Sequence, residues 1–106
     1  MKYMLIFAGD GEDNDEKVMA GVGAWWGKYS QSGAIVGGER LQPSTRATTV
    51  RFESGASRIV DGPFAETKET IGGYAIVEVP DLDAALEMAK SWPASPAVEI
   101  RPIWVD

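Results

Sequence analysis

Lys-Tyr-Met-Leu-Ile-Phe-Ala, at residues 2–8, is a short apolar run that stops at the breaker Gly9-Asp10-Gly11. Its length and its aromatic and branched side chains predict a β-strand. Apolar side chains fall at both odd and even positions, so both faces of this strand need cover and the strand is expected at the centre of a sheet. Residues 72–79 repeat the pattern. We expect them to form a second central strand.

Each of these strands is followed by an amphipathic helical pattern. Residues 16–31 place large apolar side chains on one helix face, and Ser32-Gly33 ends the segment. The second pattern starts after Asp81, a residue type that caps helices, and stops at Pro93. The chain therefore contains two strand–helix units in series.

Three further segments are predicted to be β structure. Residues 34–41 form a strand interrupted at Gly37-Gly38 by a bulge or a point of close backbone approach, residues 48–60 form a hairpin around Ser54-Gly55, and residues 98–105 form the last strand. Two strand–helix–strand units predict an α+β fold, the ferredoxin-like split βαβ sandwich with strand order 4-1-3-2. The hairpin is an insertion in it. We expect one domain over residues 1–106.

The helices of such a fold cover only one face of the sheet. Because the two central strands are apolar on the other face as well, that face also needs cover, and a second copy of the same sheet is the simplest one. We therefore predict a homodimer that packs sheet to sheet.

Composition excludes several classes of function. The 106 residues carry a net charge of −6, which disfavours nucleic acid as a partner because phosphate binding needs clustered Lys and Arg. The chain contains no His and no Cys, so thiol catalysis is excluded, and any metal would need oxygen ligands, which disfavours structural zinc and leaves magnesium, calcium or manganese open. The acidic run at residues 10–16 lacks the spacing of a calcium loop and suits a helix start. We expect no metal, no cofactor and no membrane span, and a cytoplasmic location.

Four motifs carry a family resemblance: Gly38-Glu39-Arg40-Leu41-Gln42-Pro43, Asp61-Gly62-Pro63-Phe64-Ala65-Glu66-Thr67-Lys68-Glu69, Gly72-Gly73-Tyr74 and Val98-Glu99-Ile100-Arg101-Pro102. Together they resemble the DGPF-type branch of the YCII-related family. The resemblance implies a dimeric α+β barrel of small bacterial proteins with no assigned reaction, some of them encoded beside extracytoplasmic-function sigma factors. Many YCII proteins carry a histidine in the first helix. This chain has none, so a His-dependent mechanism cannot be carried over.

Asp61 is the candidate catalytic residue, and it has two interpretations. As a structural residue, its carboxylate would accept backbone N–H bonds in an Asx turn before Gly62-Pro63. As a functional residue, it would be a buried pocket carboxylate that acts as general base in place of histidine. The structural role is the more frequent one for such a residue.

The candidate ligand-binding residues surround this loop in the sequence. Lys68 would hold an anionic group that Glu66 positions, and Arg40, Arg46 or Arg101 would clamp a carboxylate. The remaining candidates are Phe64 as an aromatic anchor, Glu39 beside the expected bulge, and Tyr74 on the sheet face away from the helices.

Two functions remain open at this point. The first is a homodimeric protein that binds a small polar or anionic organic molecule beside the Asp61 loop, with carboxylate acid–base chemistry as an extension. The second is a non-catalytic accessory or regulatory partner, for example of a sigma factor. Whether the protein is an enzyme is left undecided by the sequence.

Overall fold

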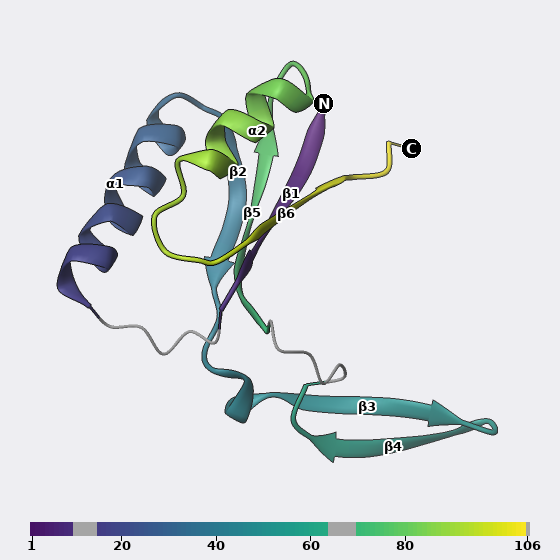
Figure 1. Cartoon of the computed structure of the whole chain (residues 1–106). Helices are drawn as coiled ribbons and strands as arrows, with labels where there is room; N and C mark the ends of the chain where they lie inside the picture. Colours follow the sequence, from purple (N-terminus) through teal and green to yellow (C-terminus); the bar gives the residue numbers. More distant parts are fainter. Residues whose placement is uncertain (10–14, 64–69, 106) are drawn as a thin grey trace.

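The computed structural model describes residues 1–9, 15–63 and 70–105. The elements follow in the order β1 (Lys2–Ala8), α1 (Glu16–Gln31), β2 (Ile35–Arg40), the 3-10 turn η1 (Ser44–Arg46), β3 (Thr48–Glu53), β4 (Ala56–Asp61), β5 (Ile71–Glu78), α2 (Leu82–Lys90) and β6 (Val98–Pro102) (Figure 1).

Four strands form one antiparallel sheet in the order β2-β5-β1-β6. When β1, β2, β5 and β6 are numbered 1 to 4 in chain order, the sheet read from β6 to β2 has the predicted order 4-1-3-2. The strands β1 and β5 lie at its centre. The strands β3 and β4 form a separate two-stranded sheet. The α+β fold with an inserted hairpin is therefore confirmed.

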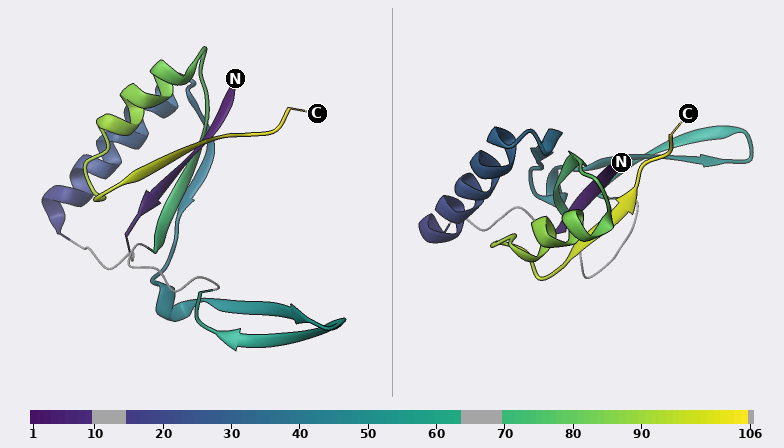
Figure 2. Two further views of the ribbon diagram at one scale, coloured as in Figure 1. Left: turned by 45° about the vertical axis from the view of Figure 1, so that its right-hand side comes forward. Right: turned by 90° about the horizontal axis from the view of Figure 1, so that it is seen from above.

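Both helices lie on one side of the sheet (Figure 2). The strand side chains that face them are buried, including Tyr3, Leu5 and Phe7 of β1 and Ala75 and Val77 of β5. Leu5 and Val77 are fully covered. The alternation along each central strand thus places every second side chain in the core.

Each helix starts at an acidic residue within a segment that the sequence marked as a helix start. Asp15 caps α1 by accepting hydrogen bonds from the backbone N–H groups of Lys17 and Val18, and Asp81 caps α2 by accepting one from Ala84. These bonds satisfy donors that have no partner within the helix. In the core, the indole N–H of Trp25 donates to the carbonyl of Met88 at 3.0 Å and so ties the two helices together.

A bulge is present in β2, at Val36, one residue before the glycine pair where it was predicted. The register against β5 shifts between Ile35 and Gly37, so one residue of β2 has no opposite residue. Gly38 then adopts a φ of +137°, a backbone conformation that residues other than glycine rarely take.

The last strand ends earlier than predicted, at Pro102 rather than residue 105. The reason is that β1 begins at Lys2, and the ladder between the two strands stops at the pair Tyr3 and Pro102. One further bond follows, from the N–H of Ile103 to the carbonyl of Lys2. Beyond it Trp104 is 92% exposed.

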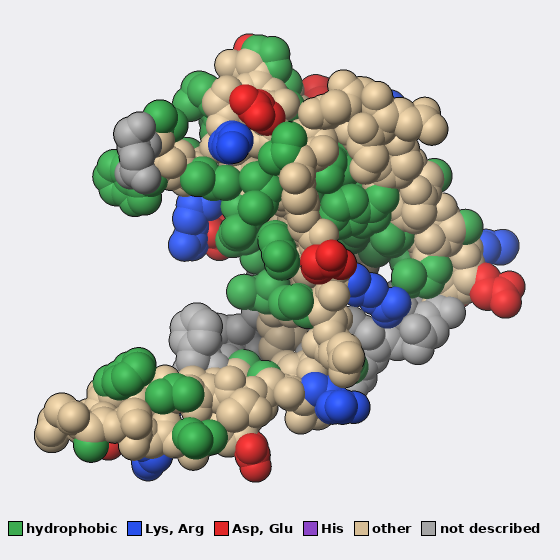
Figure 3. Space-filling model, turned by 180° about the vertical axis from the view of Figure 1, so that it is seen from behind, with side chains coloured by type: hydrophobic (Ala, Val, Ile, Leu, Met, Phe, Trp, Pro, Cys, Tyr) green, Lys and Arg blue, Asp and Glu red, His purple; other side chains and the backbone are tan. Residues whose placement is uncertain are grey.

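The sheet face away from the helices carries apolar side chains that are only half-buried: Met4 and Ile6 of β1 and Tyr74 and Ile76 of β5. We call these four side chains the open face. Seen from behind, hydrophobic side chains gather on the body above the hairpin (Figure 3). Within the described ranges, no helix is long and apolar enough to span a bilayer.

Candidate functional site

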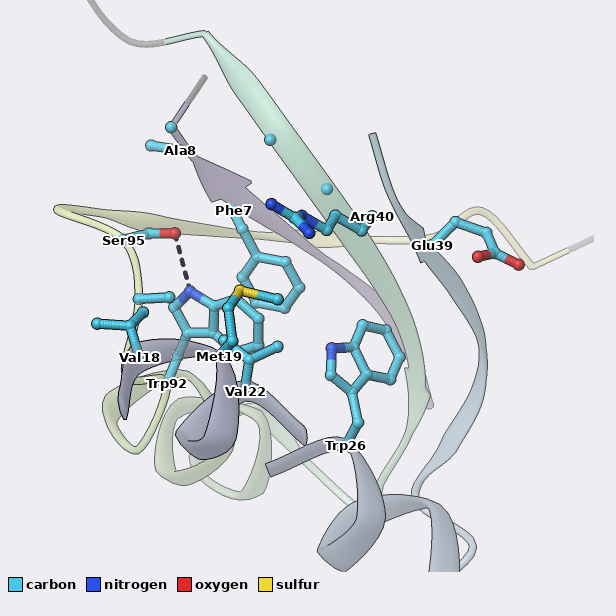
Figure 4. A pocket seen from close by; sticks show the side chains of 14 residues that line it. Phe7, Ala8, Val18, Met19, Val22, Trp26, Glu39, Arg40, Trp92 and Ser95 are labelled. Carbon is cyan, nitrogen blue, oxygen red and sulfur yellow. Dashed lines mark hydrogen bonds between the residues drawn. The ribbon is translucent and has the colours of Figure 1, made fainter. Parts of the chain in front are cut away.

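A pocket of about 200 Å³ lies on the helix side of the sheet. Its walls come from α1, from the ends of β1, β5 and β2, and from the segment that follows α2 (Figure 4). The segments that build it are far apart in the chain, since Phe7, Val22, Arg40 and Trp92 all line it.

One wall of the pocket is aromatic. The ring of Phe7 stacks on the indole of Trp92, with centroids 3.8 Å apart and planes 12° from parallel. The indole of Trp26 meets Phe7 edge-on at 6.4 Å. Trp92 is held in place by its N–H, which donates to the hydroxyl of Ser95 at 2.8 Å. This wall is therefore rigid as well as apolar.

Glycines allow the strands and α1 to approach each other at the pocket. A Cβ on Gly38 would lie 2.8 Å from the ring of Trp26, and a Cβ on Gly73 would lie 3.0 Å from the carbonyl oxygen of Glu39. The first distance is shorter than real side chains show, and the second would require the neighbouring backbone to shift by a few tenths of an ångström. Gly38 and Gly73 thus let β2, β5 and α1 approach each other beside the cavity.

The mouth of the pocket is charged. Glu39 and Arg40 end β2 and are both exposed. Figure 4 shows the Arg40 guanidinium turned toward the pocket above Phe7, whereas the Glu39 carboxylate points away from it. The result is an apolar cavity with one cation at its entrance.

This arrangement suits an organic anion with an apolar body. Guanidinium pairs with carboxylate and phosphate through two parallel hydrogen bonds, and apolar walls lower the local dielectric and strengthen such a pair. A metal is not indicated, because the described residues contain no group of three or more acidic side chains close enough to hold an ion.

Asp61 lies elsewhere. It ends β4, is exposed, and pairs with Thr48 across the hairpin. The buried surroundings that we expected for its carboxylate are not supplied by this chain alone.

The backbone around Asp61 is tightly fixed. Gly62 has a φ of +106° and donates its N–H to the carbonyl of Ala47 at 2.8 Å. The hydroxyl of Thr49 donates to the carbonyl of Gly62 at 2.6 Å. These bonds hold the start of the loop against the base of the hairpin.

The other predicted residues are divided among three places. Glu39 and Arg40 lie together at the pocket, as described. Tyr74 belongs to the open face, opposite Ile6 on β1, and Arg101 forms an ion pair with Glu99 on β6.

Phe64, Glu66 and Lys68 lie outside the described residues.

A second, wider hollow of about 1000 Å³ lies between the sheet and the base of the hairpin. Ile6, Glu99 and Arg101 line it from the sheet, and Arg46 and Thr48 line it from the hairpin side. The three arginines proposed as carboxylate clamps are therefore not equivalent, because Arg40 lines the small pocket whereas Arg46 and Arg101 line this hollow.

The sequence did not single out the residues that form the apolar walls. Val18, Met19, Val22 and Trp26 belong to the apolar helix face predicted over residues 16–31, Trp92 lies at the end of the second helical pattern, and all of them line the small pocket. Their spacing is that of a core face, so periodicity cannot separate the two roles. The one available signal was two adjacent tryptophans on a helix that precedes a strand broken by two glycines.

The fold and the pocket define a small α+β protein that pairs a two-layer sandwich with a cavity between its sheet and its first helix. The chain belongs to the YCII-related domain family, whose sequence profile matches residues 1–105. An uncharacterised protein of Rhizobium meliloti (strain 1021) is 36% identical to it over 96 residues, which are 87% of this chain and 77% of that protein.

Proposed function

We propose that this protein binds a small organic anion in the pocket between α1 and the sheet, and that it does so as a homodimer. The observation that carries the proposal is the Arg40 guanidinium, which is turned into a cavity that is otherwise apolar (Figure 4). Ligand sites in proteins combine mostly apolar walls with a few polar groups that fix orientation, and this pocket has that composition.

The pocket also limits the size of its ligand. Its volume of about 200 Å³ is below the range of drug-sized sites, so the ligand is a single ring or a short chain. Arg40 would bind its carboxylate or phosphate group, and the Phe7–Trp92 stack would contact its apolar part. The hydroxyl of Ser95 is a further polar group in the described lining of the pocket.

Carboxylate acid–base chemistry is an extension of this proposal. Asp61, at the end of β4, is the candidate general base. The sequence Asp61-Gly62-Pro63-Phe64 further supports membership in the DGPF branch of the family.

The homodimer is proposed from the open face. Four half-buried apolar side chains on neighbouring central strands form a patch of the kind that marks an interaction surface. A second copy would present the same patch, as a two-fold interface requires.

Binding is tested by a thermal-shift screen of small carboxylates and phosphates, run in parallel on the wild-type protein and Arg40→Gln. We expect some anions to raise the melting temperature of the wild type, and the neutral amide of each active acid to have no effect. Arg40→Gln should lose the response. If the anions stabilise both proteins equally, the pocket is not their site.

A protein partner is the second candidate function. Exposed apolar side chains outside the pocket favour it, among them Phe52 and Ile59 on the hairpin. A chain that stays monomeric and shows no response to any anion in the screen would support this alternative.

A further inference from the structure

The hairpin of β3 and β4, which we call the arm, extends away from the rest of the molecule (Figure 1). In the described part of the chain its two strands pair only with each other. The radius of gyration is 15.5 Å, whereas a compact chain of this length has about 13 Å. The chain is thus less compact than a self-contained domain, and the arm is the part that projects.

The arm carries apolar side chains into solvent. Phe52 is 80% exposed, Ile59 is 73% exposed and Val50 is 49% exposed. The ladder pairs Val50 with Ile59 and Phe52 with Ser57, so the three apolar side chains share one face of the arm. We call these three side chains the arm stripe.

The opposite face of the arm is charged toward its tip and carries Val60 near its base. It carries Arg51 and Arg58 in one ladder pair, and Arg58 forms an ion pair with Glu53 at 3.1 Å. The arm therefore has one face suited to water and one face suited to burial. A two-stranded hairpin is marginally stable in water unless one face packs against something, so the arm stripe needs cover.

Two observations indicate what covers it. The first is continuity: the face that holds the stripe begins at Thr48, which lines the same wide hollow as Ile6 of the open face. Hydrophobic side chains are visible along the arm and on the body above it, on either side of this hollow (Figure 3). A body that is seated on the open face would therefore also meet the arm.

The second observation is charge. Residues 48–61 contain Arg51 and Arg58 against Glu53 and Asp61, so the arm is neutral, while the whole chain carries −6. The acidic excess therefore lies outside the arm, and a neutral arm can approach the acidic body of another copy without like-charge repulsion.

We propose that each arm packs on the partner subunit of the homodimer, and that the arm stripe, Val50, Phe52 and Ile59, forms a second contact surface beside the open face. This inference rests on the homodimer proposed above. In that assembly the wide hollow of each chain is closed by the second copy, so Arg46 and Arg101 come to line an enclosed space.

The first test replaces the stripe without touching the sheet. We expect the double variant Phe52→Ser/Ile59→Ser to raise the dimer dissociation constant at least about tenfold in sedimentation equilibrium, because it removes two exposed apolar anchors. Leu82→Ser is the matched control, since Leu82 is apolar and 49% exposed but lies on α2. It should change the constant less than about twofold.

The second test leaves the stripe intact and does not depend on affinity. The chain contains no cysteine, so Ser57→Cys introduces a single thiol on the stripe face, next to Phe52. A benzophenone attached to it should give a covalent dimer on irradiation, with the adduct mapped by mass spectrometry to the body of the other chain. Glu87→Cys, on the exposed side of α2, should give little covalent dimer.

The outcomes separate this inference from the proposed dimer and from the ligand. A dimer that the stripe variant leaves intact, together with no cross-link from position 57, would overturn the arm contact alone. A wild-type chain that sediments as a monomer would overturn both the arm contact and the homodimer. Neither result changes the expectation for anion binding at Arg40.

Discussion

Phe7 and Trp92 stack face to face, with ring centroids 3.8 Å apart, and this contact joins the central strand β1 to the segment that follows α2. Trp92 lies just beyond the last helical residue, Lys90, so its ring extends the core past the end of the helix. The same two rings are also a wall of the small pocket. Packing and the candidate site therefore depend on one contact.

Replacement of Trp92 should destabilise the protein because it removes the stack and the hydrogen bond to Ser95. We expect Trp92→Ala to lower the free energy of unfolding by about 3 kcal/mol, measured by urea denaturation. Trp104→Ala is the matched control, since Trp104 is 92% exposed, and should change it by less than about 0.5 kcal/mol. Equal losses in the two variants would contradict this role of Trp92.

Gly38 should tolerate no side chain. Gly38→Ala would place a Cβ against the backbone of Tyr74 and Ala75 and 2.8 Å from the Trp26 ring, in addition to the strain of a φ of +137°. Gly9→Ala is the control for backbone strain alone, because Gly9 has a similar φ of +139° but no atom within 4 Å of an added Cβ. We expect Gly38→Ala to cost at least about 2 kcal/mol more than Gly9→Ala in urea denaturation. If the two variants lose the same stability, the close approach to Trp26 is not a constraint.

The stability of the turn that starts the Asp61 loop should depend more on Gly62 than on the carboxylate of Asp61. Gly62 has a φ of +106°, so Gly62→Ala should lower the free energy of unfolding by about 1 to 3 kcal/mol. Asp61 is exposed, and Asp61→Asn should stay within about 0.5 kcal/mol of the wild type. A large loss from Asp61→Asn would instead show that its carboxylate holds the turn.

A charge on the open face should prevent dimerisation without unfolding the chain. We expect Ile76→Asp to raise the dimer dissociation constant at least about a hundredfold, because the interface would have to bury an unpaired carboxylate. Sedimentation equilibrium measures the constant, and circular dichroism checks that the helices remain. Leu82→Asp is the control, since an acid in the first turn of α2 is tolerated. An unchanged dimer in Ile76→Asp would rule out the open face as the interface.

The fold could be predicted from the sequence because its determinants are local. The apolar run in residues 2–8 identifies a strand that is apolar on both faces. Asp15 and Asp81 mark the starts of the helices. Once two strand–helix–strand units are recognised, handedness and short connections leave few topologies. The sheet order followed from these features alone.

The candidate site was predicted only in part, because it depends on distances that no local pattern encodes. Arg40 was identified from its place beside the bulge. Trp26 was assigned to packing because a pocket-lining and a core-packing residue have the same helical spacing. Asp61 was expected near the pocket, but it ends β4 on the arm, a placement that no local pattern encodes.

The binding of an anion beside Arg40 is tested most directly by NMR of the tryptophan indole N–H groups during titration with an anion from the screen. The chain has four tryptophans; Trp26 and Trp92 line the pocket, and the exposed Trp104 serves as an internal control. We expect the Trp26 and Trp92 resonances to shift in a saturable manner, the Trp104 resonance to stay in place, and both shifts to disappear in Arg40→Gln. Saturable binding that leaves Trp26 and Trp92 unmoved, or that is unchanged in Arg40→Gln, would contradict the proposed site.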